Sequence, residues 1–383
     1  MPALLTDPFL LDPTPDRVRV VWFVAAPATD RWLEYGPDLK QRAKATSVSL
    51  SRTQEDQFSF VSDQAGDGSI FKRPTPRSIW RQEAIATQLP RGQRWPYRVC
   101  TRFADGSLVC SDRFTLAASP APGTSLKILL TSDHQLMPMV GANLQGVAAV
   151  GDRIDGVFFA GDLVNIPDRA SEWFDDNRGG AFFPCLQGRG SYALERDGTT
   201  TTYAGAPLIQ HAPMFAAVGN HEIMGRANLE NDLKTQFNDP VPCAIAAERF
   251  ERTGLSASDR EAWIRDNSFN FDTTREILNL DPRGYYAVTF GDVRLVVLLA
   301  TNIWRPAGLE PKRAGRYTEM AADLDTPDRW GYGQHIFAEI GPGSPQYVWL
   351  QKELASDAYR RAKYKIAMFH HPPHSLGGNI VPA

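Results

Sequence analysis

Hydrophobic residues recur at every second position in short stretches over the first third of the chain, a pattern typical of antiparallel strands. The clearest stretch is residues 18–24, where alternate positions from Val18 to Val24 are apolar, as expected of a strand with one buried face. Turn residues separate further stretches of this kind, which are residues 47–51, 79–88, 96–101 and 108–116. Strands at this spacing, without a helical period, predict an all-β sandwich over residues 16–118. Residues 1–15 contain four prolines and are predicted to lie along the surface as a tail.

The pattern changes after residues 119–124, a stretch rich in proline that we predict to be a linker. Continuous apolar runs then predict buried strands at residues 126–131, 156–160, 214–218, 285–290, 293–300 and 364–369. One predicted helix follows the first of these strands and has Val140, Leu144 and Val147 on one face. A second predicted helix spans residues 345–359, with Trp349, Leu350 and Leu354 turned inward. Residues 125–383 therefore read as an α/β domain, in which residues 166–210 and 225–284 are insertions over the strand ends.

Residues able to bind a metal ion follow directly after four of the predicted strands. They are Asp133, Asp162, Asn220 with His221, and His370 with His371. Because the carboxyl ends of strands in an α/β sheet open onto one crevice, these side chains are expected to converge. A mixture of oxygen and imidazole ligands suits Mn, Fe or Zn. Two such ions about 3.5–4 Å apart, bridged by the central Asp162, would clamp a phosphoryl oxygen and generate a hydroxide nucleophile.

The residues after the strands resemble the motifs of the calcineurin-like metallophosphoesterases. The motifs are Asp133, Gly161-Asp162, Gly219-Asn220-His221-Glu222 and the His-x-Pro of His370-His371-Pro372. The preceding β-sandwich and the sequence Gln346-Tyr347-Val348-Trp349-Leu350 make the resemblance closest to the purple acid phosphatase branch. The resemblance extends from residue 16 onward and implies a four-layer metallophosphoesterase sandwich, two mixed β-sheets flanked by helices, over residues 125–383.

The same resemblance implies that the first domain is a fibronectin type III-like or immunoglobulin-like sandwich. Residues 89–99 resemble the strand-entry corner of fibronectin type III domains, with Trp95 in place of the usual tyrosine.

For the metal ions, the resemblance implies a divided set of ligands. Asp133 would bind the first of two divalent ions, Asp162 would bridge both, and Asn220 and His370 would bind the second.

For the chemistry, the resemblance implies that His221 protonates the leaving group and that Glu222 orients the ring of His221. The implied activity is hydrolysis of a small-molecule phosphate ester, a monoester in preference to a diester. The alternative is a phosphoesterase-like binding module that is catalytically impaired or truncated.

Three features depart from the family's pattern. The family's Asp-x-His motif reads Asp133-His134-Gln135 here, so Gln135 would be a weak ligand and His134 would point away. Asn165 stands where purple acid phosphatases have a tyrosine, so no charge-transfer colour is expected and two divalent ions are favoured over a ferric site. None of the seven histidines forms the family's closing Gly-His-x-His motif. The sequence leaves open whether the chain is truncated or its site has been lost or rebuilt.

The remaining candidates are weaker. His211 and His335 are predicted to be loop residues with structural partners, and Arg226 a solvated loop arginine rather than a phosphate ligand. For His374, the sequence favours neither a substrate contact nor a structural role.

The charge balance and the apolar runs exclude several classes of protein. Lys and Arg number 41 against 44 Asp and Glu, a net charge of −3, which argues against a phosphate-tracking nucleic-acid binder and a polybasic membrane anchor. No apolar run approaches the roughly 18 residues of a membrane helix. The N-terminus has no basic start followed by an apolar segment, so the sequence predicts a cytoplasmic protein.

Cys100 and Cys110 flank a predicted turn at Asp105-Gly106 and would face each other across a hairpin. They would form either a cross-strand disulfide or a pair of reduced thiols. The predicted cytoplasmic location favours the thiols.

Overall fold

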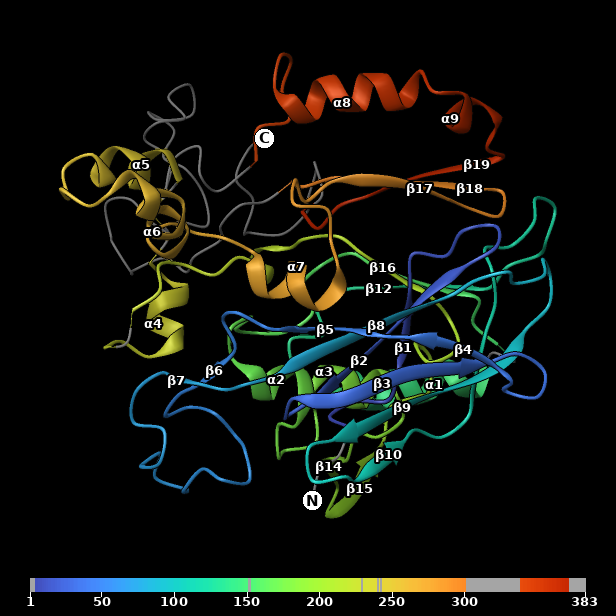
Figure 1. Cartoon of the computed structure of the whole chain (residues 1–383), viewed down its shortest axis with the longest axis horizontal. Coiled ribbons are helices and arrows are strands. Elements are labelled where there is room, and N and C mark those ends of the chain that lie inside the picture. Colours follow the sequence, from blue (N-terminus) through green and yellow to red (C-terminus); the bar gives the residue numbers. More distant parts are fainter. Residues whose placement is uncertain are drawn as a thin grey trace.

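Two antiparallel sheets pack face to face in the first part of the chain, and an α/β part follows (Figure 1). The computed structural model describes residues 4–150, 153–228, 230–239, 241, 243–300 and 338–371. One sheet has the order β1-β2-β8-β5, and the other has the order β10-β9-β3-β4 with β11 paired to β9. These strands are β1 (Phe9–Leu11), β2 (Val18–Val24), β3 (Ala28–Tyr35), β4 (Gln41–Lys44), β5 (Thr46–Ser49), β8 (Trp80–Ala86), β9 (Trp95–Phe103), β10 (Leu108–Cys110) and β11 (Phe114–Leu116). A short pair, β6 (Gln54–Glu55) and β7 (Thr75–Pro76), lies in the connection between β5 and β8.

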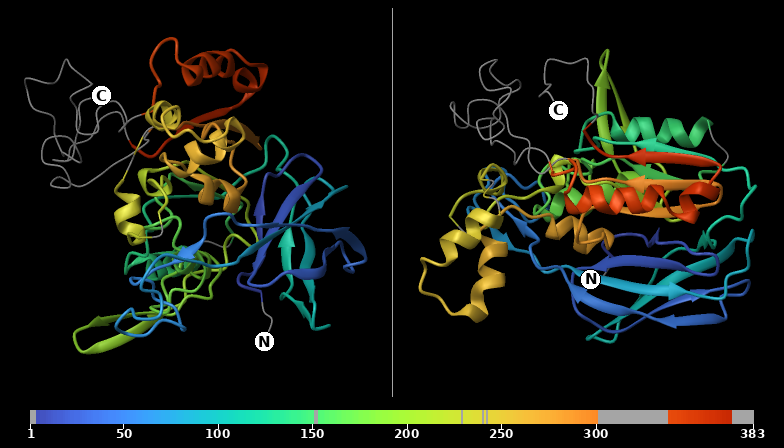
Figure 2. Two further views of the ribbon diagram at one scale, coloured as in Figure 1. Left: turned by 60° about the vertical axis from the view of Figure 1, so that its left-hand side comes forward. Right: turned by 90° about the horizontal axis from the view of Figure 1, so that it is seen from above.

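Strand β2 is buried on both faces, which corrects the prediction of a single buried face. Val20 and Trp22 pack in the core between the two sheets of the sandwich. Val21 and Phe23 pack on the opposite side, in a core that the sandwich shares with the α/β part. The sheet that contains β2 is therefore covered by the α/β part, and Figure 2 shows the two parts side by side.

The prediction of a surface tail over residues 1–15 is wrong for Phe9–Leu11. These residues form β1, which pairs with β2 in antiparallel register, and all three are buried. The Phe9 ring lies 4.9 Å from that of Phe183 in the α/β part. The segment is ordered because its apolar side chains fill the junction between the sandwich and the α/β part.

The two cysteines of the β9–β10 hairpin are bonded to each other. The register pairs Cys110 with Cys100, as the sequence predicted, with the Cα atoms 4.1 Å apart, and the sulfurs form a disulfide. The preference for reduced thiols is therefore wrong, because the prediction weighed the cellular compartment rather than the close approach that this register imposes.

Two three-stranded sheets form the centre of the α/β part. The first has the order β12-β13-β16 and is parallel, and the second has the order β17-β18-β19. Their strands are β12 (Ile128–Thr131), β13 (Gly156–Phe159), β16 (Met214–Ala216), β17 (Tyr286–Phe290), β18 (Val293–Val297) and β19 (Tyr364–Met368). Side chains such as Phe158 and Phe215 from the first sheet pack against Phe290 and Leu295 from the second. The strand predictions in this part are confirmed to within a few residues.

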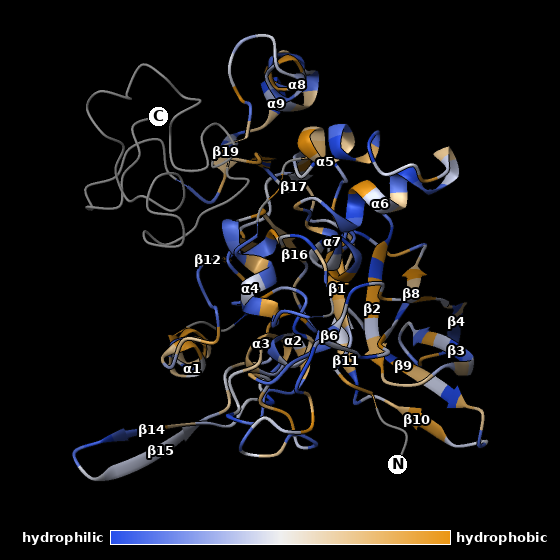
Figure 3. Cartoon of the chain, turned by 90° about the vertical axis from the view of Figure 1, so that its left-hand side faces the viewer, coloured by the Kyte–Doolittle hydropathy of each residue, from blue (hydrophilic) through white to orange (hydrophobic). Residues whose placement is uncertain are grey.

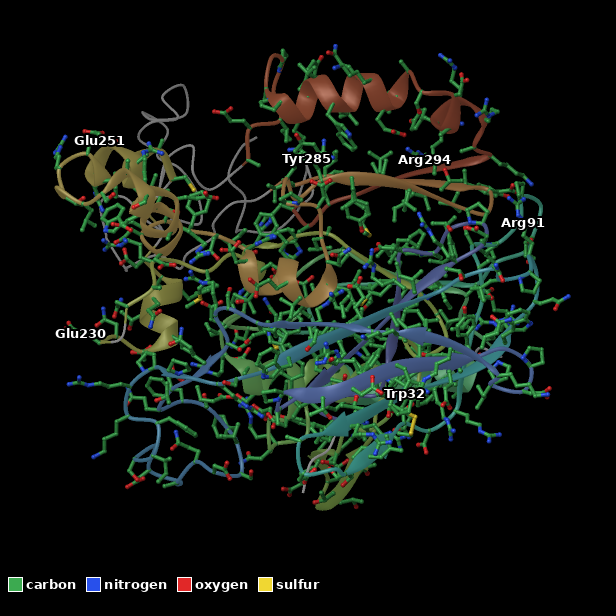
Figure 4. The ribbon with its side chains drawn as sticks, in the orientation of Figure 1. Trp32, Arg91, Glu230, Glu251, Tyr285 and Arg294 are labelled. Atoms are coloured by element: carbon green, nitrogen blue, oxygen red, sulfur yellow. A yellow bond between two sulfur atoms is a disulfide. The ribbon has the colours of Figure 1, made fainter. Side chains whose placement is uncertain are left out.

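Helices cover the outer faces of these two sheets (Figure 1). Three helices pack on the first sheet, namely α1 (Val140–Val150), α2 (Ala170–Phe174) and α3 (Phe182–Leu186). Helix α8 (Pro345–Leu354), followed by α9 (Asp357–Arg361), lies over the second sheet. Tyr285 and Arg294 lie between that sheet and α8 (Figure 4), where Arg294 pairs with Glu353 through two hydrogen bonds of 2.7 and 2.8 Å. No helix in the described part of the chain combines the length and the apolar character needed to cross a membrane.

The two predicted insertions carry the remaining elements. These are the hairpin of β14 (Tyr192–Arg196) and β15 (Thr199–Tyr203), the helices α4 (Leu233–Phe237), α5 (Cys243–Phe250), α6 (Arg260–Asp266) and α7 (Asp272–Leu278), and a short 3₁₀ turn, η2 (Ala257–Asp259). A second 3₁₀ turn, η1 (Asn220–Glu222), lies between the two insertions. The β14–β15 hairpin projects from the body and is hydrophilic to neutral along its length (Figure 3).

The predictions for the first strand and the last helix of the α/β part are wrong in two respects. Strand β12 is not buried, because it lies at the edge of its sheet within the described residues, and Leu130 is 66 % exposed. The helix predicted over 345–359 is interrupted after Leu354, where Ser356 caps the start of α9 through the backbone N–H of Tyr359. Leu354 lies on the surface, contrary to the prediction, while Trp349 is partly buried against Tyr285.

Candidate metal centre

Three residues from three strand ends meet at one edge of the two sheets. Asp133 follows β12, Asp162 follows β13 and His370 follows β19. Each offers a ligand atom, and these three atoms all lie within 4.8 Å of one another. The structure thus brings together three of the residues that the sequence proposed as metal ligands. Two carboxylates and an imidazole form a donor set that suits Mn, Fe or Zn.

The backbone at this edge has an uncommon conformation. Asp133 and Asp162 have positive φ angles of 55° and 59°, and Gly161 has a φ of 96°. Non-glycine residues rarely adopt such angles, and those that do gather at functional sites. Gly219 is required by close approach, because a Cβ atom there would collide with the carboxylate of Asp162.

Asp162 is the centre of the hydrogen bonds in this cluster. Its Oδ1 accepts from the backbone N–H of His221 at 3.0 Å, and its Oδ2 accepts from Nε2 of Gln135 at 2.8 Å. The Nε2 atom of His370 lies 3.2 Å from the same Oδ2. Burial alone would raise the pKa of Asp162, but the hydrogen bond with His370 and the nearby imidazoles lower it below its usual value, which keeps the carboxylate charged.

His370 presents Nε2 to the cluster. Its Nδ1–H donates to the backbone carbonyl of Ala160 at 2.9 Å, an arrangement that fixes the tautomer and orients the ring as in metal-binding histidines. Burial alone would lower the pKa of His370, but the hydrogen bond and the charge of Asp162 raise it to about 9.

We expect metal binding at this cluster to release a proton. Because the pKa of His370 is raised to about 9, the ring carries a proton at pH 7 that a metal ion must displace from Nε2. The affinity for Mn should therefore increase with pH up to about 9, with release of about one proton at pH 7. Titration calorimetry at pH 7 in two buffers of different ionisation enthalpy measures this release, and an affinity that is constant from pH 6 to 9 would contradict the expectation.

Glu222 holds the loops that carry the cluster. Its Oε2 accepts from the backbone N–H groups of Gly219 and Asp162 at 2.7 and 2.8 Å, and its Oε1 accepts from Leu163 at 2.8 Å. Burial and the charge on Asp162 raise the pKa of Glu222, while the three N–H donors oppose this effect. Among the described residues the carboxylate of Glu222 bonds to these backbone donors, and the ring of His221 is oriented instead by the carbonyl of Asn165.

We expect Glu222→Gln to destabilise the protein by about 1–3 kcal/mol, because the amide can accept at only one oxygen and leaves a buried N–H of Gly219, Asp162 or Leu163 unpaired. Urea denaturation measures the change in the free energy of unfolding. The matched control is Glu276→Gln, because the carboxylate of Glu276 accepts from the backbone N–H and hydroxyl of Ser51 at an exposed position. An equal change in the free energy of unfolding for the two substitutions would show that the buried hydrogen bonds of Glu222 stabilise the fold no more than the exposed ones of Glu276.

His221 lies beside the cluster and is oriented by the backbone. Its Nδ1–H donates to the carbonyl oxygen of Asn165 at 2.7 Å, and its ring packs against Phe237 with centroids 5.2 Å apart. Nε2 has no hydrogen-bond partner among the described residues. Asn220 is buried next to His221 with 4 % exposure.

Other residues that the sequence considered have partners outside the cluster or lie outside the described residues. His134 is buried, with Nε2 3.1 Å from the hydroxyl of Thr131, and burial lowers its pKa to about 4. His211 accepts a hydrogen bond from the backbone N–H of Thr115, and Arg226 forms an ion pair with Asp239. His335 and His374 lie outside the described residues.

The sequence missed the contribution of the β-sandwich to the surroundings of His221. Asp56, in the β6–β7 connection, accepts from the guanidinium of Arg169 at 3.0 and 3.1 Å. Arg169 also donates to Glu172, which accepts from the backbone N–H of Asn165, the residue that orients His221. No local spacing in the sequence indicates this arrangement, because Asp56 and Arg169 are 113 residues apart.

The fold described above is similar to that of a solved purple acid phosphatase. The protein is PPD1 from seeds of yellow lupin (Lupinus luteus), with a TM-score of 0.50 and 15 % sequence identity. The similarity covers 94 % of this chain and 50 % of the lupin chain, so the chain spans half the length of that phosphatase. This chain therefore has an α/β fold similar to that of a purple acid phosphatase.

Other comparisons add nothing to this conclusion. Astrotactin-2 (9 % identity over 38 % of this chain and 26 % of that chain) and a family 28 exopolygalacturonase of Yersinia enterocolitica (17 % over 41 % and 27 %) have TM-scores of 0.19 and 0.17, too low to indicate a shared fold. No family model matches the chain, and no curated protein matches it in sequence.

Proposed function

We propose that this chain hydrolyses small-molecule phosphate esters at the cluster of Asp133, Asp162 and His370. The observation that carries the proposal is the convergence of the three ligand atoms within 4.8 Å, at the strand ends of a fold similar to that of a purple acid phosphatase. The hydrogen bond from Nδ1 of His370 to the carbonyl of Ala160 supports a metal-binding role, because it leaves Nε2 directed at the cluster. Asn220 and Gln135 would complete the donors for two divalent ions of Mn, Fe or Zn. When bound, such ions supply Lewis-acid polarisation of a phosphoryl oxygen and lower the pKa of water.

The protein's own residues position the ester and supply a proton. In the hydrolysis, a water oxygen forms a bond to phosphorus while the bond from phosphorus to the ester oxygen breaks, and the proton that the water loses passes to solvent, from which His221 is reprotonated. His221 delivers a proton from Nε2 to the departing oxygen, because its Nδ1 is held by Asn165. Glu222 acts at a distance, by fixing the backbone at Gly219, Asp162 and Leu163.

The leaving-group dependence of His221→Asn tests this proposal. With Mn supplied, the substitution should lower kcat/KM for ethyl phosphate by about 10²–10⁴-fold, because an alkoxide needs a proton to leave. The loss should be much smaller for 4-nitrophenyl phosphate, whose phenolate leaves without a proton. His211→Asn is the matched control, because His211 is a loop histidine bonded to Thr115. Equal losses on both esters would rule out proton donation by His221, and no hydrolysis of any ester by the wild-type protein would rule out the proposed function.

A binding module without catalysis is the second candidate, and it rests on Gln135. At this position the amide donates through Nε2 to Asp162 instead of offering an imidazole. Metal analysis of the purified chain separates the two candidates, because two tightly bound ions per chain would contradict a module that has lost its metal site.

The finer description of the fold belongs to the same proposal. We propose that the α/β part is a four-layer metallophosphoesterase sandwich and that the preceding β-sandwich is of the fibronectin type III class.

A further inference from the structure

A cavity of about 490 Å³ lies next to His221, on the side of the leaving group in the proposed reaction. Its walls include His221, Asn165, Phe237, Phe58, Phe60 and Lys234, whereas Asp133, Asp162 and His370 do not line it. Its volume lies in the range of about 300–1,000 Å³ that is typical of small-molecule sites. Since His221 protonates the ester oxygen in the proposed function, the group attached to that oxygen would extend into this cavity.

The β-sandwich supplies two of the aromatic walls. Phe58 and Phe60 lie in the β6–β7 connection. Their side chains are large and apolar, yet they are 52 % and 44 % exposed. The connection is held against the α/β part on both sides of them. Asp56 accepts from the backbone N–H of Leu233 at 2.8 Å, and the carbonyl of Phe60 accepts from Asn177 at 2.8 Å. These two hydrogen bonds hold the backbone that carries both rings against the α/β part.

The third aromatic wall connects the cavity to the reacting centre. Phe237, in α4, packs against the ring of His221 at 5.2 Å. A planar apolar group in the cavity would therefore contact Phe58, Phe60 and Phe237 while its ester oxygen remains at His221. Offset or edge-to-face contacts of this kind are favourable beyond the burial of apolar area.

Among the described residues, one cation of the cavity, Lys234, has no ion-pair partner. Arg178 stacks over Phe60 at 4.0 Å and is neutralised by Asp176 through two hydrogen bonds of 2.9 and 2.7 Å. Arg169 is paired with Asp56 and Glu172. Lys234 is exposed and has no ion-pair partner in the part of the chain that the structure describes. A ligand with an anionic substituent would complement Lys234.

We infer that this cavity selects esters whose leaving group is an aromatic ring bearing one anionic substituent. The inference rests on the proposed function, because it places the leaving group beyond His221. Specificity would then be determined in part by the β-sandwich, through Phe58 and Phe60.

The aromatic part of the inference is tested with the double variant Phe58→Ala/Phe60→Ala and Mn-supplemented protein. The ratio of kcat/KM for phenyl phosphate to kcat/KM for ethyl phosphate should fall roughly tenfold. Ile70→Ala is the matched control, because Ile70 lies in the same connection, is 59 % exposed and does not line the cavity. An unchanged ratio in the double variant would overturn the inference while leaving the proposed function intact.

The anionic part is tested with Lys234→Gln, which should lower the preference for 4-carboxyphenyl phosphate over phenyl phosphate by roughly 3–10-fold. Lys72→Gln, at an exposed position of the β6–β7 connection, is the control. Equal preferences in the wild-type protein and Lys234→Gln would overturn this part.

Binding of phosphonates separates a failure of this inference from a failure of the proposed function. If the wild-type protein hydrolyses no ester, calorimetry with 4-carboxyphenylphosphonate and methylphosphonate, which have no ester bond, still probes the cavity. Tighter binding of the aryl compound that the Phe58→Ala/Phe60→Ala variant weakens would support the cavity as an aryl-anion site. Equal binding of the two compounds would overturn it.

Discussion

Asp162→Ala is expected to lower kcat/KM for an aryl phosphate by about 10³-fold or more in the presence of Mn. Asp162 is the one residue of the cluster that contacts Gln135, His370 and the backbone of His221 together. The substitution removes a proposed metal ligand. It also removes the hydrogen bonds that orient Gln135, His370 and the backbone of His221. Losing several kcal/mol of the stabilisation that metal ions give to the charge of the transition state raises the activation free energy enough for a change in rate of this size.

The matched control for this prediction is Asp155→Ala, at the opposite end of the same strand. Asp155 precedes β13 and accepts from the backbone N–H of Lys127 at 2.9 Å and from Arg153, whereas Asp162 follows β13. We expect the control to lose about 1 kcal/mol of stability and to keep its metal content and rate. The measurements are steady-state kinetics and metal analysis of both variants. Turnover by Asp162→Ala within tenfold of the wild-type rate would exclude Asp162 from the proposed centre.

The sequence predicted the strand ends of the α/β part because local chemistry determines them. Strand β13 is covered on both faces, so its residues are all apolar, and Gly161-Asp162 marks its end. The same reasoning failed for β12, which is as apolar as β13 but lies at the sheet edge of the described residues. An apolar run reports the tendency to be buried, whereas burial itself depends on which strands become neighbours.

The contacts between the β-sandwich and the α/β part could not be predicted from local patterns. Phe23 and Phe9 are apolar in either kind of fold, and the sequence does not say that they meet Phe183 across the junction. For the site, the strand-end motifs predicted that Asp133, Asp162 and His370 converge, and the structure brings these three together. The resemblance implied that Glu222 orients the ring of His221, but Glu222 has other hydrogen-bond partners among the described residues. Its carboxylate is directed to backbone N–H groups. Every residue except proline has such a group, so the amino-acid sequence does not indicate these partners.

A chain of hydrogen bonds, buried at Asp56, Arg169 and Glu172, connects the sandwich to His221. Asp56 binds Arg169, Arg169 binds Glu172 at 2.8 Å, and Glu172 binds the backbone N–H of Asn165 at 2.7 Å. The carbonyl of Asn165 then holds Nδ1 of His221. The sandwich is therefore connected to the proposed proton donor through contacts in which Asp56 and Glu172 are almost completely buried.

Asp56→Ala is accordingly expected to destabilise the protein by about 3–5 kcal/mol, because it leaves two guanidinium nitrogens of Arg169 without their carboxylate in a buried site. The backbone N–H of Leu233 also loses its acceptor. Urea denaturation measures the free energy of unfolding, and kcat/KM on ethyl phosphate measures the effect on His221 in the fraction that remains folded.

Asp175→Ala provides the comparison for Asp56→Ala, because Asp175 also joins the two parts of the chain, through Arg77. The Asp175 side chain is 42 % exposed, against 0 % for Asp56. Its loss should cost at most about 1 kcal/mol, since exposed ion pairs contribute little. Only Asp56→Ala should also reduce the rate on ethyl phosphate relative to 4-nitrophenyl phosphate, because only Asp56 is connected to His221. A similar loss of stability in the two variants, with no change in leaving-group dependence, would show that the sandwich supports the fold without positioning the proton donor.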